Sequence, residues 1–143
     1  MQPRFKTVGE IRITNKLSCA EDVPAYVVAL ELLDTSFQGL PVLNRSGRVV
    51  GKLTEIDLLN ALKAGRDLKT TLAGEIMAPP PPIVRPETPI EEAIEIMDVN
   101  RLVRLPVIDA GRFIGSVTRH DLLRAWLGLW LDHEKGSHVE VIG

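Results

Sequence analysis

The clearest pattern of hydrophobic and polar positions along this chain begins at residue 90 and predicts an amphipathic helix. In the run IEEAIEIMDVN the apolar residues recur every three or four positions, at Ile90, Ala93, Ile94 and Met97. A proline-bearing turn precedes the run, and acidic residues occupy its start, where carboxylates favour the positive end of the helix dipole. We therefore expect a helix that begins after Pro89 and buries one face.

Two short β-rich runs follow this helix, and a second helix ends the pattern. Residues 105–108 and 113–117 are rich in branched apolar side chains and flank a turn at residues 109–111, which predicts a β-hairpin. A helix is expected from about His120. The first half of the chain shows the same order: a helix near 24–34, strands near 40–43 and 48–53, and a helix near 55–64 that stops at Gly65.

This shared order reflects an internal duplication. Residues 40–62 read LPVLNRSGRVVGKLTEIDLLNAL and residues 105–126 read LPVIDAGRFIGSVTRHDLLRAW, so the second copy is one residue shorter. Such small units bury little surface alone, and we expect the copies to pair and share a core. The duplication divides the chain into three segments. They are an N-terminal arm with the first repeat at 1–71, the second repeat at 72–131 and a polar C-terminal tail at 132–143. The proline-rich segment 78–82 is expected to be an extended connector.

Composition limits what the paired repeats can do. The 143 residues are 45% hydrophobic and 25% charged, which is typical of a folded globular protein. The net charge of −2 makes nucleic acid an unlikely partner, although the arginines at 101, 104, 112, 119 and 124 keep that alternative open. The single cysteine favours a cytoplasmic protein without disulfides, and no apolar stretch is long enough for a membrane helix.

Each copy places the same polar motif, Gly-x-x-Thr-x-x-Asp, directly after its last predicted strand. The motif residues are Gly51, Thr54 and Asp57 in the first copy and Gly115, Thr118 and Asp121 in the second. One interpretation is structural: the threonine caps the helix and the aspartate favours its positive end. The other is functional, because free amides, a hydroxyl and a carboxylate at a helix start suit a phosphorylated sugar.

With both copies in register over residues 7 to about 131, the chain resembles the cystathionine-β-synthase (CBS) domain family, whose tandem pairs are called Bateman modules. The likeness is carried by the Leu-Pro-Val strand, the Gly-bearing turn, the Gly-x-x-Thr-x-x-Asp exit and the Leu-Leu helix of each copy. The resemblance implies an α+β (mixed α/β) fold of two β-α-β-β-α repeats, paired about a pseudo-twofold axis with two clefts between the sheets. It also implies adenosine derivatives as ligands, and homodimers.

The resemblance assigns binding roles to residues of both copies. Asp57 and Asp121 would hold ribose hydroxyls, while Thr54 and Thr118 would approach the ribose or phosphate. Residues before each Leu-Pro-Val and in each first strand would line the adenine pocket: Phe37, Gln38, Gly39, Ser18 and Cys19 in the first copy, and Leu102, Val103, Arg104, Ile83 and Val84 in the second. Ser116, inside the second motif, joins the predicted ligand-binding set.

The two predicted sites differ in charge. Arg119 and His120 stand between Thr118 and Asp121, where the first copy has Glu55 and Ile56, so the second site is expected to be more favourable for an anion. A solvated helix start is the alternative for this basic pair. Lys52 shares a strand face with Thr54 and could either reach a phosphate or plug the first pocket. One occupied site is therefore expected rather than two.

Residues that could carry catalysis or a metal lack a recognised arrangement. The helix carboxylates Glu91, Glu92 and Glu95 are expected on a polar face, and Cys19 is expected to be packed. His120, His133 and His138 are too loosely spaced for a metal motif. The sequence therefore predicts neither an enzyme nor a metal site, and no catalytic cofactor.

The last predicted helix is apolar around most of its circumference, through residues 122, 123, 125–127 and 129–131. We expect part of it to form an oligomer contact, the alternative being that the N-terminal arm covers it. Together these features predict a regulatory module that binds AMP, ADP, ATP or S-adenosylmethionine and signals by conformational change, as a homodimer, to an unidentified protein target. The competing hypothesis is a structural homodimerisation module with empty or plugged clefts.

Overall fold

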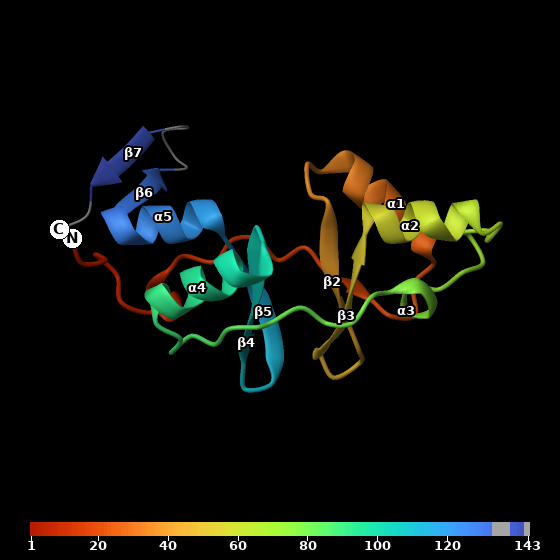
Figure 1. Ribbon diagram of the computed structural model, residues 1–143, viewed down its shortest axis with the longest axis horizontal. Coiled ribbons are helices and arrows are strands. Elements are labelled where there is room, and N and C mark those ends of the chain that lie inside the picture. The colour runs from red at the N-terminus through yellow and green to blue at the C-terminus, as the bar shows by residue number, and fades with distance from the viewer. Residues whose placement is uncertain (133–137, 142–143) are drawn as a thin grey trace. The chain divides into compact units, whose positions relative to one another are not determined.

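The computed structural model describes residues 1–132 and 138–141, which form two compact units (Figure 1). Unit 1 contains Met1–Asn15, Pro82–Asp109 and Ile114–Gly143, and unit 2 contains Lys16–Pro81 and Ala110–Phe113. Each unit has its own cluster of buried hydrophobic side chains. The fold is α+β, with helices lying against small sheets, as the sequence predicted.

Unit 2 holds the first repeat. Its elements are β1 (Cys19–Ala20), α1 (Ala25–Asp34), β2 (Gly39–Leu43), β3 (Val49–Thr54), α2 (Glu55–Lys63) and the short α3 (Ala73–Ile76). The sheet order is β1-β2-β3, with β1 parallel to β2 and β2 antiparallel to β3. These bounds confirm the helices and strands expected for the first copy. Gly65, with φ 86°, follows α2 as predicted.

The alternation of burial along β3 separates a core face from a second face of the strand. Gly51 and Leu53 are buried, whereas Lys52 and Thr54 are half-buried on the opposite side. Leu53 packs with Val42 of β2 and Val28 of α1 in the unit 2 core. The sheet therefore presents the motif threonine away from the core it shares with the helices.

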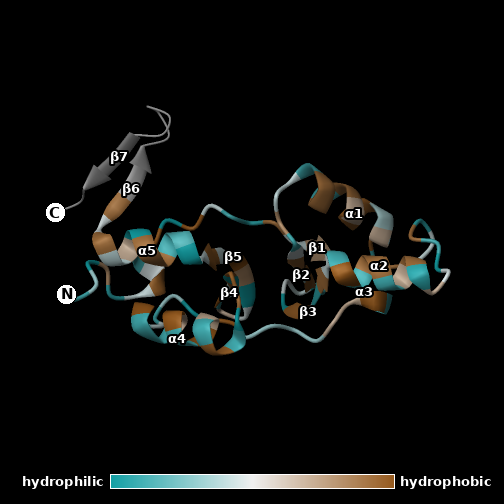
Figure 2. Ribbon diagram, turned by 45° about the horizontal axis from the view of Figure 1, so that its top comes forward, coloured by the Kyte–Doolittle hydropathy of each residue, from teal (hydrophilic) through white to brown (hydrophobic). Residues whose placement is uncertain are grey.

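Unit 1 holds the second repeat except for Ala110–Phe113, which belong to unit 2. The elements are a 3-10 turn η1 (Val8–Glu10), α4 (Ile90–Asn100), β4 (Arg104–Asp109), β5 (Arg112–Thr118) and α5 (Arg119–Leu127). The hairpin turn between β4 and β5 uses Ala110 and Gly111, whose φ values are 51° and 81°. Val84 forms a parallel bridge to Val107, just as Cys19 of β1 pairs with Val42. The second repeat thus reproduces the first, and Figure 2 shows the mixed hydrophobic and hydrophilic faces of α4 and α5.

The short segment that precedes each repeat packs in the unit of the other repeat. The Val8 amide donates to the Thr88 carbonyl, and the Ala73 amide, 65 residues later, donates to the Val23 carbonyl. Val8 is fully buried in the unit 1 core together with Ile11. The two compact units therefore differ from the two sequence repeats divided at 71/72. Residues 1–15 belong to the unit of the second repeat, and residues 72–81 belong to the unit of the first.

The last helix is shorter than predicted. It ends at Leu127 because Gly128 adopts a left-handed conformation with φ 73° and caps the helix. The strands β6 (Leu129–Asp132) and β7 (His138–Val141) then pair antiparallel. The expectation that residues 129–131 continue the helix is wrong, and part of the segment expected to be a polar tail forms β7.

The N-terminal arm covers only part of α5. The amides of Arg4 and Phe5 donate to the carbonyls of Trp126 and Ala125, at 2.9 and 3.1 Å. Phe5 and Trp126 both pack against the unit 1 core. Leu123 and Leu127 nevertheless keep 60% and 42% of their surface exposed. The arm therefore pairs with the end of α5 through its backbone but leaves Leu123 and Leu127 exposed.

Residues 78–82 connect the two repeats. Lys52 and Ala78 exchange backbone hydrogen bonds of 3.1 and 2.8 Å, and the prolines that follow lie in neither a helix nor a strand, as predicted. In the part of the chain that the structure describes, no helix has the length and apolar character needed to cross a membrane.

Candidate functional site

The first motif begins α2 with a reciprocal capping box. The Thr54 amide donates to Asp57 Oδ2 at 2.9 Å, and the Asp57 amide donates back to Thr54 Oγ1 at 3.4 Å. The Thr54 hydroxyl also donates to Asp57 Oδ2, at 2.8 Å. The structural interpretation of this motif is confirmed, and the cap uses one carboxylate oxygen. Among the described residues, the second oxygen of Asp57 accepts no hydrogen bond.

The second motif begins α5 with the same box but adds an ion pair. The Thr118 amide donates to Asp121 Oδ2 at 2.9 Å, and the Asp121 amide donates to Thr118 Oγ1 at 3.1 Å. Asp121 Oδ1 accepts a hydrogen bond from Arg124 at 3.1 Å, in a pair that is partly exposed. From the sequence, Arg124 was expected only as part of a basic patch. Its three-residue spacing from Asp121 on a helix is the signal that indicates the pair.

This arrangement is chemically suited to a sugar phosphate. Each aspartate is fixed by its cap, so its orientation is set before any ligand arrives. The nine-residue helices α2 and α5 turn their positive ends toward the motif, where an anion is favoured. A carboxylate oxygen of the motif can accept hydrogen bonds from ribose hydroxyls, while the positive end of the helix favours a phosphate nearby.

Close packing explains why the first motif has a glycine, and backbone conformation explains the glycine of the second. A Cβ at Gly51 would lie 2.5 Å from Met77 Sδ and 2.8 Å from the Ala78 carbonyl oxygen. Gly115 has a φ of 143°, a conformation that side chains disfavour. Both glycines therefore shape the strand that carries the motif, and neither needs a ligand to explain it.

The predicted adenine-wall segments lie against the motifs within each unit. The Glu55 amide donates to the Gln38 carbonyl at 2.9 Å, and the Arg119 amide donates to the Val103 carbonyl at 3.1 Å. Gly39 pairs directly with Thr54 across β2 and β3. The structure thus brings Gln38 and Gly39 to the first motif and Leu102 and Val103 to the second.

Burial distinguishes the predicted wall residues from one another. Val84 and Ser116 are only 2% and 1% exposed, so their side chains lie inside unit 1 rather than on its surface. Ile83 is half-buried, as are Phe37 and Ser18. Arg104 is half-buried as well, and this desolvation lowers the pKa of its guanidinium. Among the predicted wall residues, Val103 and Gln38 are exposed to solvent.

Cys19 is a packed thiol. It is half-buried against the unit 2 core, and desolvation raises its pKa to about 11. A thiol with a raised pKa stays protonated at neutral pH and is a poor nucleophile. Cys19 is therefore a small packed side chain of β1, as predicted.

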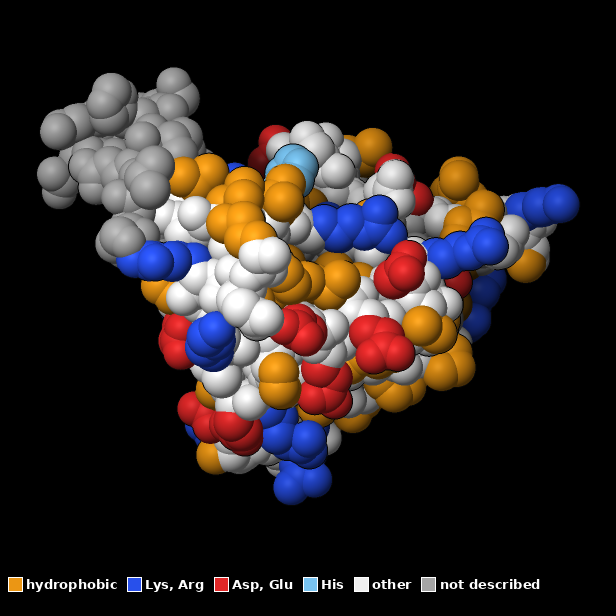
Figure 3. Space-filling model, turned by 60° about the vertical axis from the view of Figure 1, so that its left-hand side comes forward, with side chains coloured by type: hydrophobic (Ala, Val, Ile, Leu, Met, Phe, Trp, Pro, Cys, Tyr) orange, Lys and Arg blue, Asp and Glu red, His pale blue; other side chains and the backbone are white. Residues whose placement is uncertain are grey.

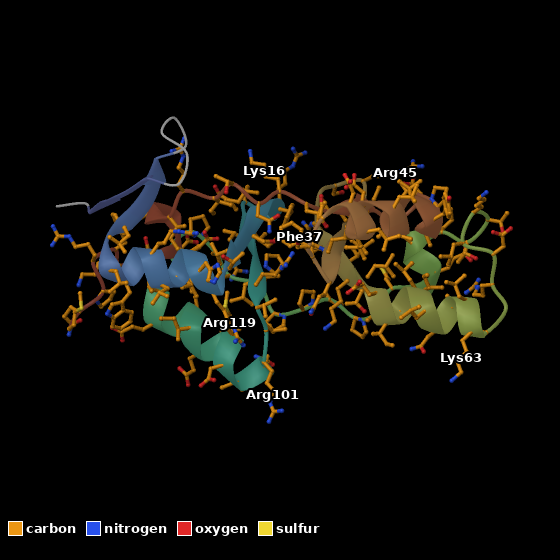
Figure 4. The ribbon with its side chains drawn as sticks, turned by 90° about the horizontal axis from the view of Figure 1, so that it is seen from above. Lys16, Phe37, Arg45, Lys63, Arg101 and Arg119 are labelled. Carbon is orange, nitrogen blue, oxygen red and sulfur yellow. The ribbon has the colours of Figure 1, made fainter. Side chains whose placement is uncertain are left out.

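The basic residues of the predicted sites take different positions. Arg119 Nε donates to the Leu102 carbonyl at 2.7 Å, so the side chain contacts the wall segment (Figure 4). His120 is exposed at the start of α5. Lys52 is half-buried and shares a strand face with Thr54, as predicted. The Arg119 contact was not foreseen, because it joins residues 17 positions apart.

The described residues line a groove in unit 1 and a pocket in unit 2. A groove of about 580 Å³ runs between α4 and α5 in unit 1, lined by Ile94, Met97, Asp98, Arg119, Leu122, Leu123 and Trp126. A smaller pocket of about 320 Å³ in unit 2 is lined by Glu21, Asp22, Arg45, Leu72, Gly74 and Glu75. Among the described residues, no three His, Cys, Asp or Glu side chains are grouped to hold a metal ion. His133 lies outside the described residues.

The model of the CBS domain family matches this chain twice, over residues 8–64 and 73–128. The chain belongs to the CBS domain family and contains a tandem CBS pair, a class of module that is generally regulatory.

Known proteins share both the sequence and the fold. The chloroplastic CBS domain-containing protein CBSX2 of Arabidopsis thaliana is 30% identical over 138 residues, covering 76% of this chain and 58% of that protein. A crystal structure of Arabidopsis CBSX2 aligns with a TM-score of 0.71 and 28% identity, covering 85% of this chain and 94% of the other. A structure of CBSX2 in complex with AMP aligns with a TM-score of 0.68 and 29% identity, covering 83% and 94%.

Some relatives are longer proteins. Arabinose 5-phosphate isomerase KdsD of Pseudomonas aeruginosa is 30% identical over 123 residues, covering 80% of this chain but only 38% of the isomerase. The chain thus spans less than two thirds of the length of these curated relatives.

Proposed function

We propose that this CBS pair is a regulatory module that binds an adenine nucleotide at its Gly-x-x-Thr-x-x-Asp motifs and signals by a change of conformation. The observation that carries the proposal is the pre-oriented carboxylate of each capping box, fixed beside the positive end of a helix. AMP is the first ligand to test, because the CBSX2 structure that contains AMP is 29% identical to this chain. ADP, ATP and S-adenosylmethionine share its adenosine half.

We place the principal site in the second repeat. Arg119 and His120 follow Thr118 at the start of α5 and Arg104 begins β4, whereas Glu55 and Ile56 occupy the matching helix start of the first repeat. Asp121 is engaged by Arg124 in a partly exposed ion pair, and ion pairs near the surface contribute little, about 0–1 kcal/mol. A ribose can therefore displace or share this contact at small cost, while the basic side chains favour a phosphate.

Thermal unfolding with added nucleotide tests the proposal. At about 100 times its dissociation constant a ligand stabilises the protein by roughly 2.7 kcal/mol, which raises the melting temperature by several degrees. We expect AMP to produce such a shift in the wild type, Asp121→Asn to lose it and Asp57→Asn to keep most of it.

The comparison uses the difference between samples with and without AMP, because both variants also weaken a helix cap. Glu55→Gln is the matched control, since it removes a carboxylate next to a motif without touching the cap. Absence of a shift with every adenosine compound, from a folded wild type, would refute nucleotide binding. Loss of the shift in Asp57→Asn alone would move the site to the first repeat.

A second function, homodimerisation, is supported by exposed hydrophobic side chains on the helices. In unit 2 they are Tyr26, Val27, Leu30 and Leu33 on α1 and Ile56, Leu59 and Leu62 on α2. Patches of this kind mark protein interfaces. In unit 1, Leu123 and Leu127 of α5 are exposed as well. Figure 3 shows hydrophobic side chains, in orange, gathered on the face that it presents.

Sedimentation velocity checks this second function. We expect a dimer from the wild type and a monomer from the double variant Leu33→Glu/Leu59→Glu, because a charge on each side chain opposes burial of the patch. The control is Glu31→Gln on the same helix, which should leave the dimer intact. A monomeric wild type at the concentrations of the nucleotide titrations would contradict the proposal.

A further inference from the structure

The two hairpin turns carry the same Gly-Arg pair, one from each repeat. The pair is Gly47 and Arg48 at the turn between β2 and β3, and Gly111 and Arg112 at the turn between β4 and β5. The second turn packs in unit 2 beside the first, and the Phe113 amide donates to the Gly47 carbonyl at 2.9 Å. Unit 2 therefore brings together two turns that lie far apart in the chain.

Each arginine lies beside the glycine of the other turn. A Cβ placed on Gly47 would lie 3.6 Å from Arg112 Cγ, and one placed on Gly111 would lie 4.0 Å from Arg48 Nη2. Both glycines adopt left-handed conformations, with φ values of 80° and 81°. Because this backbone conformation disfavours a side chain, the turns leave room for the two arginines to extend over them.

This pair of arginines has no counterion among the described residues. Arg48 and Arg112 are exposed, and neither guanidinium forms a hydrogen bond or an ion pair in that part of the chain. Asp109, which precedes the second turn, forms no ion pair with them either. Neighbouring like charges repel one another, and an anion bound between them removes that repulsion. The two turns therefore form a surface that favours an anionic group.

A third arginine, Arg45, lies on the first turn and is also exposed. We call Arg45, Arg48 and Arg112 the turn patch. Arg45 also lines the smaller pocket of unit 2 together with Glu21 and Asp22, so its charge is partly offset by their carboxylates. The positive charge of the turn patch is therefore centred on the other two arginines.

We propose that the turn patch is a docking surface for an acidic segment, rich in aspartate and glutamate, of a partner protein. A guanidinium binds a carboxylate through two parallel hydrogen bonds, so the two adjacent arginines can hold two neighbouring carboxylates of such a segment. The surface belongs to unit 2 and uses none of the motif residues. The inference therefore goes beyond the nucleotide site and does not depend on it.

The size of the turn patch favours an acidic protein segment over larger polyanions. A strongly salt-dependent DNA-binding protein makes about 6–10 phosphate contacts. Basic clusters that bind anionic lipids contain about 4–8 lysines or arginines. Two of the arginines that kept nucleic acid open in the sequence are also engaged elsewhere, Arg119 with the Leu102 carbonyl and Arg124 with Asp121. The turn patch thus offers too few cations for either polyanion.

Fluorescence anisotropy with a labelled peptide made only of glutamate tests the proposal, in the absence of nucleotide. We expect the wild type to bind this peptide and the double variant Arg48→Gln/Arg112→Gln to bind it about fivefold or more weakly, because two exposed ion pairs are lost. A glutamine peptide of equal length should not bind. Addition of the glutamate peptide should shift the amide NMR signals of residues 45–48 and 110–113. Circular dichroism verifies that the variants are folded.

Lys63→Gln is the control variant, because it also removes an exposed positive charge from unit 2. Figure 4 shows Lys63 and Arg45 on opposite sides of this unit, so the control should bind the glutamate peptide as the wild type does. A folded wild type that does not bind the glutamate peptide overturns the proposal, as does equal binding by the double variant. Tighter binding of a DNA duplex or of phosphatidylserine vesicles, lost in the double variant, would overturn the assignment to an acidic protein segment.

Discussion

Replacing Gly51 with valine is expected to lower the free energy of unfolding by about 3 kcal/mol, the upper part of the range for overpacked positions. The new Cβ would meet Met77 Sδ at 2.5 Å and the Ala78 carbonyl oxygen at 2.8 Å. The methionine can rotate, but the carbonyl cannot easily move because Lys52 and Ala78 exchange two backbone hydrogen bonds. The connector after α3 would have to leave β3. Chemical denaturation of the wild type and the variant measures the loss.

Gly65→Ala is the matched control for the Gly51 substitution. Gly65 has a φ of 86°, and a Cβ added there would meet no atom within 4 Å, so only backbone strain opposes a side chain at this position. The expected loss is about 1 kcal/mol. Equal losses at the two positions would contradict the contact with residues 77–78 as the reason for the glycine of the first motif.

Replacing Val8 with aspartate is expected to unfold unit 1 or to lower its free energy of unfolding by about 4 kcal/mol or more, because an unpaired charge would be buried. Val8 is fully buried, in a core made mainly by residues of the second repeat. Its amide also donates to the Thr88 carbonyl, which fixes the side chain in that core. Thermal unfolding followed by circular dichroism measures the effect.

Val99→Asp provides the comparison for Val8→Asp, since the same change is made at a residue of α4 that is 73% exposed. We expect a change within about 0.5 kcal/mol at this surface position. A Val8→Asp protein as stable as Val99→Asp would show that the N-terminal segment is a dispensable arm rather than part of unit 1.

The sequence predicted the elements well where local patterns determine them. The helix that begins at Ile90 and the Leu-Pro-Val strands lie within a few residues of their expected bounds, because periodicity and turn residues act over short distances. Gly128 shows the limit of this reasoning. The apolar run on both sides of it suggested a continuous helix, but a left-handed glycine ends α5 and the chain continues as β6.

The sequence predicted which residues form the candidate site, but it predicted less well how they contact one another. The Gly-x-x-Thr-x-x-Asp motif indicated a helix cap and a ligand site from the same residues, and the structure confirms the cap at both positions. The sequence could not show that Ser116 and Val84 are buried, because burial depends on how separate elements pack. It also could not show that Arg119 contacts Leu102, since that pair lies far apart in the chain.

The sequence alone determined the duplication, the order of helices and strands in each repeat and the two motifs, since all of these are encoded in local spacing and internal repetition. Tertiary structure decided which segments share a core. Residues 8–11 and 73–76 look alike in sequence, yet each packs in the unit that holds the other repeat. The physical reason is that a short apolar segment stabilises the fold only where it fills a particular cavity between other elements. That cavity exists only after the elements have come together.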